Sequence, residues 1–260
     1  MTRTRLPKGP RMILPALPLL AAVTGAVFAS AFLRGLTGFG FALAAVPILS
    51  LVIAPASAVA IAVLLQVAIG LSDMVTLRGL FDRAELLRLS LGALLGTPVG
   101  IAALSLLSPN ASRIGIAAIV LIGLGFLLRR PTAQSRPRPT LAVGAGLLAG
   151  VFSGMAAMPG PPAVAYFLST DTPPQTARAS LMMFFFVAAL LATPGLAFAG
   201  VIDAQVLILS AVALPALWAG TWAGTAAFRR LGNGHYRKIA LAMMAAMALL
   251  AGWRGIAAYL

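Results

Sequence analysis

The sequence contains no cysteine and a single histidine, His235. Without cysteine the chain can form no disulfide, no thiolate nucleophile and no cysteine-based metal site. His235 lies in a basic loop, and a metal-binding or catalytic role would need partner side chains that the sequence does not show. We therefore expect no catalytic residues, no metal, no cofactor and no enzymatic activity.

Charged residues are also scarce, at 9% of the chain, and only five of them are acidic. Hydrophobic residues make up 61%, and the mean hydropathy is +1.02. A soluble core of this size could not use so much apolar surface, so the composition predicts a multi-pass membrane protein. The length leaves room for about eight spans of roughly 20 residues and for no soluble domain.

The formal net charge is nevertheless +14. Most basic residues lie between or beside apolar runs, where cytoplasmic loops collect lysine and arginine. The sequence shows no RNA- or DNA-binding module, so we expect the charge to reflect membrane topology and contact with lipid headgroups, with no nucleic-acid partner. The basic clusters are Arg3/Arg5/Lys8/Arg11, Arg78/Arg83/Arg88, Arg129/Arg130/Arg136/Arg138 and Arg229/Arg230/Arg237/Lys238.

The stretch Ala31–Leu49 (AFLRGLTGFGFALAAVPIL) combines glycines, a proline and a lone arginine inside a longer apolar run. Helix breakers free backbone groups that hydrocarbon cannot satisfy, so a break at membrane depth lines a cavity or packs against protein. A second stretch, Gly150–Leu168 (GVFSGMAAMPGPPAVAYFL), has the same design. Broken segments in corresponding positions of two halves point to the binding site of a transporter.

We therefore expect an all-α polytopic membrane protein built from two repeated halves. Each half would contain about four to five transmembrane segments, one of them a broken or re-entrant helix. Residues 1–128 would form the first repeat with its basic tail, 129–140 a basic proline-rich linker, and 141–260 the second repeat. Pro55 and Pro174 occupy matching positions in the two halves.

The relative orientation of the repeats stays open. A basic tail and a basic linker on the same side demand an even number of crossings in the first half, whereas loop charges later in the chain favour opposite sides. We read Arg78–Arg88 as a short amphipathic piece at the membrane surface. The expected apolar elements are 13–33, a shorter one ending near 52, 57–76, 89–106, 112–128, 141–152 leading into the second break, 175–198, 205–228 and 239–258.

The two broken stretches carry a family resemblance. Gly35–Gly40 (GLTGFG) precedes Pro47–Leu49 in the first half, and Ser153-Gly154 precedes Gly160–Pro162 and Tyr166–Leu168 in the second. With these residues the sequence resembles the TauE/SafE permease family, membrane proteins linked to the export of sulfite and organosulfur anions. The resemblance implies a membrane permease. The later small-residue stretches Gly96–Gly100 and Gly220–Gly224 also resemble the family, whereas Met155–Pro159 replaces a stretch that is more often glycine-rich.

Arg34 is the strongest candidate for a functional side chain. It lies inside an apolar run, directly before the first break, and an unpaired arginine there costs from a few to about ten kcal/mol. Such a residue needs a partner, a water-filled cavity or an anionic ligand, and its planar guanidinium suits a sulfur oxyanion. The alternative is an interfacial arginine whose side chain extends to the headgroups.

The breaks themselves supply the second part of the expected site. A half-helix that begins at a break can direct its free N–H groups and its dipole at an anion. Alternatively these glycines only allow close helix packing, which we favour for Gly96, Gly100, Gly220 and Gly224. The residues expected to bind substrate are Arg34, Thr37, Gly38, Gly40, Ser153, Gly160, Pro161, Tyr166 and Arg178.

Two further polar residues lie in apolar spans. We expect Gln66 to hydrogen-bond between helices rather than to contact substrate. Asp73 is the acidic residue nearest the membrane interior, and no chain of carboxylates and histidines for proton coupling is visible.

The sequence thus predicts a secondary transporter in a bacterial plasma membrane that exports a small sulfur-containing anion, sulfite or an organosulfonate, by alternating access. An inside-negative potential favours outward movement of one anion by roughly 2.3 kcal/mol per 100 mV, so export needs no coupling ion. An importer of an organic acid or another oxyanion on the same fold stays open, as does a membrane partner subunit without transport of its own. Glycine-rich faces are compatible with a homo-oligomer.

Overall fold

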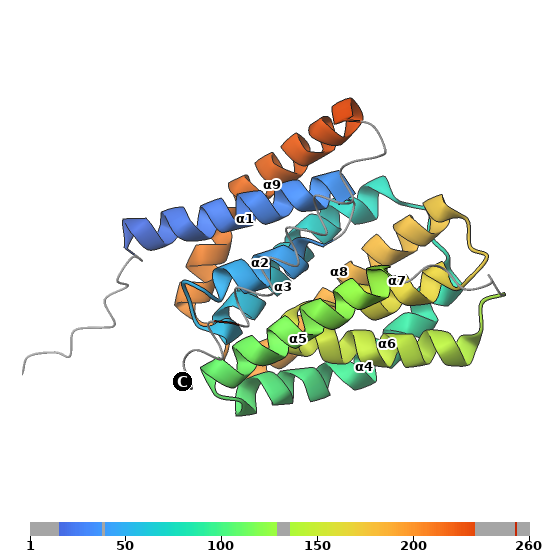
Figure 1. Cartoon of the computed structure of the whole chain (residues 1–260), viewed down its shortest axis with the longest axis horizontal. Coiled ribbons are helices and arrows are strands. Elements are labelled where there is room, and N and C mark those ends of the chain that lie inside the picture. Colours follow the sequence, from blue (N-terminus) through green and yellow to red (C-terminus); the bar gives the residue numbers. More distant parts are fainter. Residues whose placement is uncertain (1–15, 38–39, 129–135, 232–252, 254–260) are drawn as a thin grey trace, which may run out of the picture.

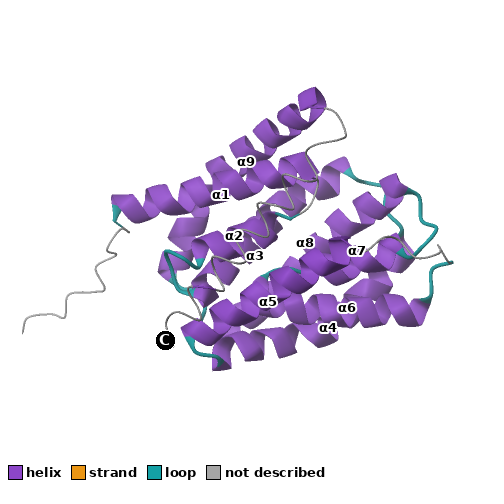
Figure 2. Cartoon of the chain, viewed as in Figure 1, coloured by secondary structure: helices purple, strands orange, loops and turns teal. Residues whose placement is uncertain are grey.

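The computed structural model describes residues 16–37, 40–128, 136–231 and 253, and the following account concerns these residues. They form nine helices packed side by side (Figures 1 and 2). The helices are α1 (Leu17–Thr37), α2 (Phe41–Leu49), α3 (Pro55–Thr76), α4 (Arg83–Leu106), α5 (Pro109–Leu128), α6 (Pro139–Ala156), α7 (Gly160–Leu168), α8 (Pro174–Phe198) and α9 (Ala204–Leu231).

Six of these helices, α1, α3, α4, α6, α8 and α9, are long and apolar enough to cross a membrane. The protein is therefore a multi-pass, all-helical membrane protein, as the composition predicted. Most expected apolar elements match observed helices, and the element expected over 239–258 lies outside the described residues apart from Trp253.

The interpretation of Arg78–Arg88 as a separate surface piece was wrong from Arg83 onward, whereas residues 78–82 form a loop. From Arg83 onward the chain belongs to the long helix α4. Asp82 caps this helix, because its Oδ1 accepts the N–H groups of Ala84 at 2.8 Å and Glu85 at 3.1 Å. The cap starts α4 earlier than hydropathy suggested.

Helices end and restart where the sequence placed its breakers. In the first half α1 ends at Thr37 and α2 begins at Phe41, after Gly40 with a φ of 90°. In the second half α6 ends at Ala156 and α7 begins at Gly160, after Ala157 with a φ of 57°. Each short helix has nine residues, about half of what a membrane crossing needs.

Glycines bring two pairs of helices into close contact. A Cβ atom at Gly96 of α4 would lie 2.0 Å from the carbonyl oxygen of Leu147 on α6. Likewise, a Cβ at Gly224 of α9 would lie 2.1 Å from the carbonyl oxygen of Phe32 on α1. Only glycine permits such backbone approach, so the packing role favoured for these small-residue stretches is confirmed. Gly100 and Gly220 make the same kind of contact.

The chain direction differs between the two halves. Figure 1 shows α1 beginning at the left of the bundle and α6 beginning at the right. The loop between α3 and α4, the start of α6 and the end of α9 all lie toward the right. These segments carry six of the described basic residues, Arg78, Arg83, Arg136, Arg138, Arg229 and Arg230. Arg113 lies near the start of α5, and that helix begins at the opposite end of the bundle.

Candidate functional site

A cavity lies where the two helix breaks meet α3 and α8. Its volume is about 40 Å³. That is room for about three water molecules or a small ion. The lining residues are Arg34, Gly40, Phe41, Ala42, Leu43, Gln66, Ile69, Gly70, Asp73, Ala157, Met158, Pro159, Gly160, Met182, Phe185 and Phe186.

Arg34 and Asp73 are the two charged residues in this lining, and they form an ion pair. Nη2 of Arg34, in the last turn of α1, donates a hydrogen bond to Oδ2 of Asp73, in the last turn of α3. Their side chains are 11% and 15% exposed, so neither is fully sealed from the cavity. The partner that a buried arginine needs is thus a carboxylate on another helix.

The start of α2 forms one wall of the cavity. Gly40, Phe41, Ala42 and Leu43 all line it. The first bond along this helix runs from the Ala44 N–H to the Gly40 carbonyl, so the N–H groups of residues 41–43 precede the helical ladder. Such a helix start attracts an anion through these N–H groups and through its dipole.

The start of α7 also lines the cavity but offers fewer donors. Pro159, Pro161 and Pro162 have no backbone N–H, which leaves Gly160 as the donor in the first two residues of this helix. The carbonyl of Ala157, freed by the break, accepts a hydrogen bond from Nε2 of Gln66 at 2.9 Å. The predicted interhelical hydrogen bond of Gln66 is therefore confirmed, although Gln66 also lines the cavity.

Three residues expected to bind substrate lie in the cavity lining, namely Arg34, Gly40 and Gly160. Gly38 lies outside the described residues, as does the side chain of Thr37. Arg178 is exposed and lies one helical turn before Met182, a lining residue of α8. It interacts electrostatically with both Arg34 and Asp73.

The remaining expected residues lie outside this lining. Ser153 is buried on α6, at 1% exposure. Pro161 packs against α5, where a Cβ at Gly123 would lie 2.5 Å from its ring. Tyr166 is buried near the end of α7 and takes part in a separate polar network.

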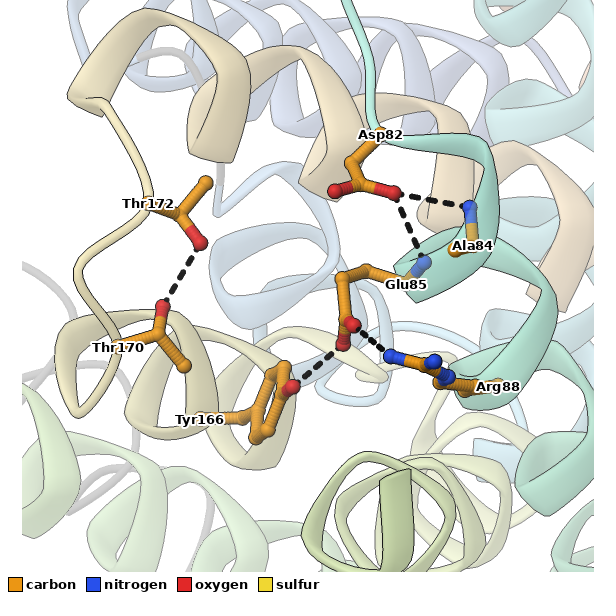
Figure 3. A network of polar contacts seen from close by, with 7 residues as sticks. All are labelled: Asp82, Ala84, Glu85, Arg88, Tyr166, Thr170 and Thr172. Atoms are coloured by element: carbon orange, nitrogen blue, oxygen red, sulfur yellow. Dashed lines mark hydrogen bonds and ion pairs between the residues drawn. The ribbon is translucent and has the colours of Figure 1, made fainter. Parts of the chain in front are cut away.

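That network surrounds Glu85, which is 2% exposed in the first turn of α4 (Figure 3). The Tyr166 hydroxyl donates to Oε2 of Glu85, and Nη1 of Arg88 donates to Oε1. The two donors approach the carboxylate from different sides (Figure 3). Tyr166 thereby ties the end of α7 to the start of α4. Sequence reasoning missed this buried carboxylate because it placed Glu85 in a surface segment.

Sequence reasoning also missed that Asp73 pairs with Arg34 and that three phenylalanines line the same cavity. Phe41, Phe185 and Phe186 line the same cavity. One signal was available, since Arg34 and Asp73 are single charges of opposite sign near the ends of apolar spans. Among the described residues, no group of three or more His, Cys, Asp or Glu side chains could hold a metal ion.

Comparison with known proteins assigns the family. Residues 22–251 match the family described as "Sulfite exporter TauE/SafE". A protein of Cupriavidus necator named "Probable sulfite/organosulfonate exporter TauE" is 29% identical over 220 residues, which cover 82% of this chain and 84% of that protein. No solved structure matches the chain. The chain belongs to the TauE/SafE sulfite exporter family and is a membrane transporter, not an enzyme.

Proposed function

We propose that the protein exports a small sulfur-containing anion, sulfite or an organosulfonate, across the plasma membrane of a bacterium by alternating access. The observation that carries this proposal is the shared cavity of Arg34 and the start of α2. The Arg34 guanidinium and a helix start whose first N–H groups precede the helical ladder converge there, and both favour an oxyanion. The Asp73 carboxylate lines the same cavity and pairs with Arg34. The family and the Cupriavidus necator relative support the sulfur-containing substrate.

The residues of the cavity suggest how the anion is held. Arg34 would bind two oxygens through its planar fork, and the N–H groups of residues 41–43 would approach the third. Gly160 would add one N–H from the start of α7. Phe185 and Phe186 would exclude water and accommodate the apolar part of an organosulfonate.

The charge distribution supports a cytoplasmic opening. Lysine and arginine collect in cytoplasmic loops, so in this proposal the basic end of the bundle faces the cytoplasm. Arg34 and Asp73 lie in the last turns of α1 and α3, and Arg178 lies near the start of α8. These helix ends lie at the basic end of the bundle (Figure 1), so an exporter would load its anion from that side. The basic tail lies outside the described residues, and α1, which follows it in the chain, begins at the opposite end of the bundle.

The packing pattern supports two inverted repeats, with the boundaries 1–128, 129–140 and 141–260. In this scheme α6 is the counterpart of α1, and α4 is the counterpart of α9. Helix α1 packs against α9, and α6 packs against α4. The counterparts α3 and α8 pack against each other. Because α1 and α6 run in opposite directions, these exchanged contacts fit a two-fold axis in the membrane plane (Figure 1). In this arrangement both short helices are re-entrant.

Flux of labelled sulfite into proteoliposomes under a set membrane potential tests the proposal. An imposed potential that is positive inside should drive sulfite inward through the wild-type protein, because the transported species is an anion. The variant Arg34→Gln keeps the approximate side-chain shape and removes the charge. We expect it to lower the flux by at least about 100-fold, since a charge-assisted contact is lost from a water-poor site.

Arg78→Gln provides the matched control, because it removes an exposed arginine from the loop between α3 and α4. This variant should transport like the wild type. Size-exclusion profiles should show that all three proteins are folded. Wild-type protein that carries no sulfite would contradict the proposed substrate, and normal flux through Arg34→Gln would remove Arg34 from the site.

A further inference from the structure

The guanidinium of Arg34, the positive charge of the proposed site, is already paired with the carboxylate of Asp73. Asp73 accepts the hydrogen bond that Arg34 donates, and both side chains line the cavity. We propose that Asp73 is an internal substitute for the transported anion: it neutralises Arg34 when the carrier is empty and is displaced when the anion binds. This inference rests on the proposed function and assigns a positioning role to a residue outside the expected substrate-binding set.

The geometry allows such an exchange of partners. Arg34 has five N–H donors, and within the described residues one of its nitrogens bonds to Asp73. The two side chains come from different helices, so one can move without the other. Each keeps a partly exposed surface, at 11% and 15%. An anion that enters the cavity can therefore reach the guanidinium before the ion pair has opened.

Arg178 completes the arrangement. It is close enough to interact electrostatically with Asp73, and it lies one helical turn beyond the cavity lining on α8. A carboxylate displaced from Arg34 would thus keep a positive charge nearby. This lowers the free-energy cost of releasing Asp73 into a poorly solvated region.

The physical reason for an internal substitute lies in the transport cycle. An exporter must move its empty site back through the membrane, and an unpaired arginine is costly there. An ion pair carries no net charge, so the empty carrier can return. The same carboxylate competes with the anion, which keeps binding weak enough for release on the far side.

Asp73→Asn separates this role from a purely structural one. The substitution keeps the side-chain size and removes the competing charge. We expect the KM for sulfite to fall by about tenfold, because the anion no longer displaces a charged partner. Net flux should fall by at least about tenfold, because the empty carrier would return with an unpaired arginine. Sulfite–sulfite exchange, which never requires the empty carrier, should stay within about threefold of wild type.

The experiment measures labelled sulfite in proteoliposomes twice, once into sulfite-free vesicles and once into vesicles preloaded with unlabelled sulfite. Asp171→Asn, in the exposed turn between α7 and α8, is the matched control and should leave both modes unchanged. Thermal unfolding verifies that each variant is folded. If Asp73→Asn does not fold, Asp73→Ser carries the test, because it leaves room for a water molecule beside Arg34.

If Asp73→Asn loses net flux but retains sulfite–sulfite exchange, the result supports Asp73 as the internal substitute. Equal losses in both modes would assign Asp73 a structural role and overturn the inference, as would two unchanged modes. No sulfite movement through the wild type in either mode would overturn the proposed function, and this inference with it. Failure of the proposed function is therefore seen in the wild-type protein, whereas failure of this inference alone is seen only in Asp73→Asn.

Discussion

The two helix breaks resemble each other in shape and differ in chemistry. Each joins a long helix to a nine-residue helix, and both short helices begin at the same cavity. The first break combines Arg34 with a helix start whose N–H groups are available. The second break carries Pro159, Pro161 and Pro162, which supply no N–H, and its freed carbonyl at Ala157 is bonded to Gln66.

Under the proposed function this difference gives the two breaks separate roles. The first break would supply the groups that attract the anion, and the second would line the cavity without adding many donors. Proline at the start of α7 costs little, because the first N–H groups of a helix have no partner within the helix. Proline at the start of α2 would remove N–H donors that the proposed anion site uses.

Among the variants that compare the two breaks, introducing a proline of the second break into the first should have the largest effect. Ala42→Pro places proline at the second residue of α2, where Pro161 stands in α7. The helix should persist, because the N–H of residue 42 precedes its internal bonds. We expect sulfite flux to fall by about 10- to 100-fold through loss of one donor to the anion.

The reverse variant, Pro161→Ala, is the control for this experiment. It returns an N–H to α7 outside the cavity lining and should keep flux within about threefold of wild type. A larger loss in Pro161→Ala than in Ala42→Pro would reverse the assignment of roles. Both proteins are compared in the same proteoliposome assay at equal protein content.

The second break should depend on Gln66 for its stability. Gln66→Leu leaves the Ala157 carbonyl without its donor at 2.9 Å, so the free energy of unfolding should fall by about 1–3 kcal/mol. Detergent-induced unfolding followed by circular dichroism measures this change. Thr193→Val is the matched control, because Thr193 donates to the Ala189 carbonyl within its own helix α8, and loss of this bond should cost under about 1 kcal/mol. Equal costs would mean that the break does not rely on Gln66.

The smallest effect is expected at the left-handed residue of the second break. Ala157 has a φ of 57°, which is strained for a residue with a Cβ atom. Ala157→Gly should therefore raise the free energy of unfolding by about 1 kcal/mol. Ala156→Gly, one residue earlier in α6, should lower it by a similar amount, because glycine is a poor helix former. The same unfolding assay compares them, and a loss in both variants would contradict the strain at Ala157.

Several features were readable from the chain because they depend on local chemistry. The membrane location follows from composition, because long helices with so few charges and so much apolar surface are stable in a lipid bilayer rather than in water. The helix breaks follow from Gly40 and from the prolines near Gly160. The packing role of Gly96 and Gly224 follows from the absence of a side chain.

Where local chemistry misled, a tertiary contact or a cap explains the difference. The segment Arg78–Arg88 reads as a surface piece because of its charges, yet Asp82 caps α4 there and Glu85 is buried against Tyr166. The hydroxyl of Tyr166, a residue expected to bind substrate, is bonded to Glu85, far along the sequence, and the local pattern did not indicate this contact. Hydropathy averages over such pairs and cannot detect them.

By itself the sequence determined that this protein is a helical membrane permease with two broken segments and one arginine at depth. Only the tertiary structure decided that Arg34 pairs with Asp73, that Gln66 bonds to Ala157, and that α1 packs on α9 while α6 packs on α4. The physical reason is that lipid gives apolar helix faces no preference for one another, so partners are selected by close fit and by pairing of a few polar groups. Both depend on which faces meet in space.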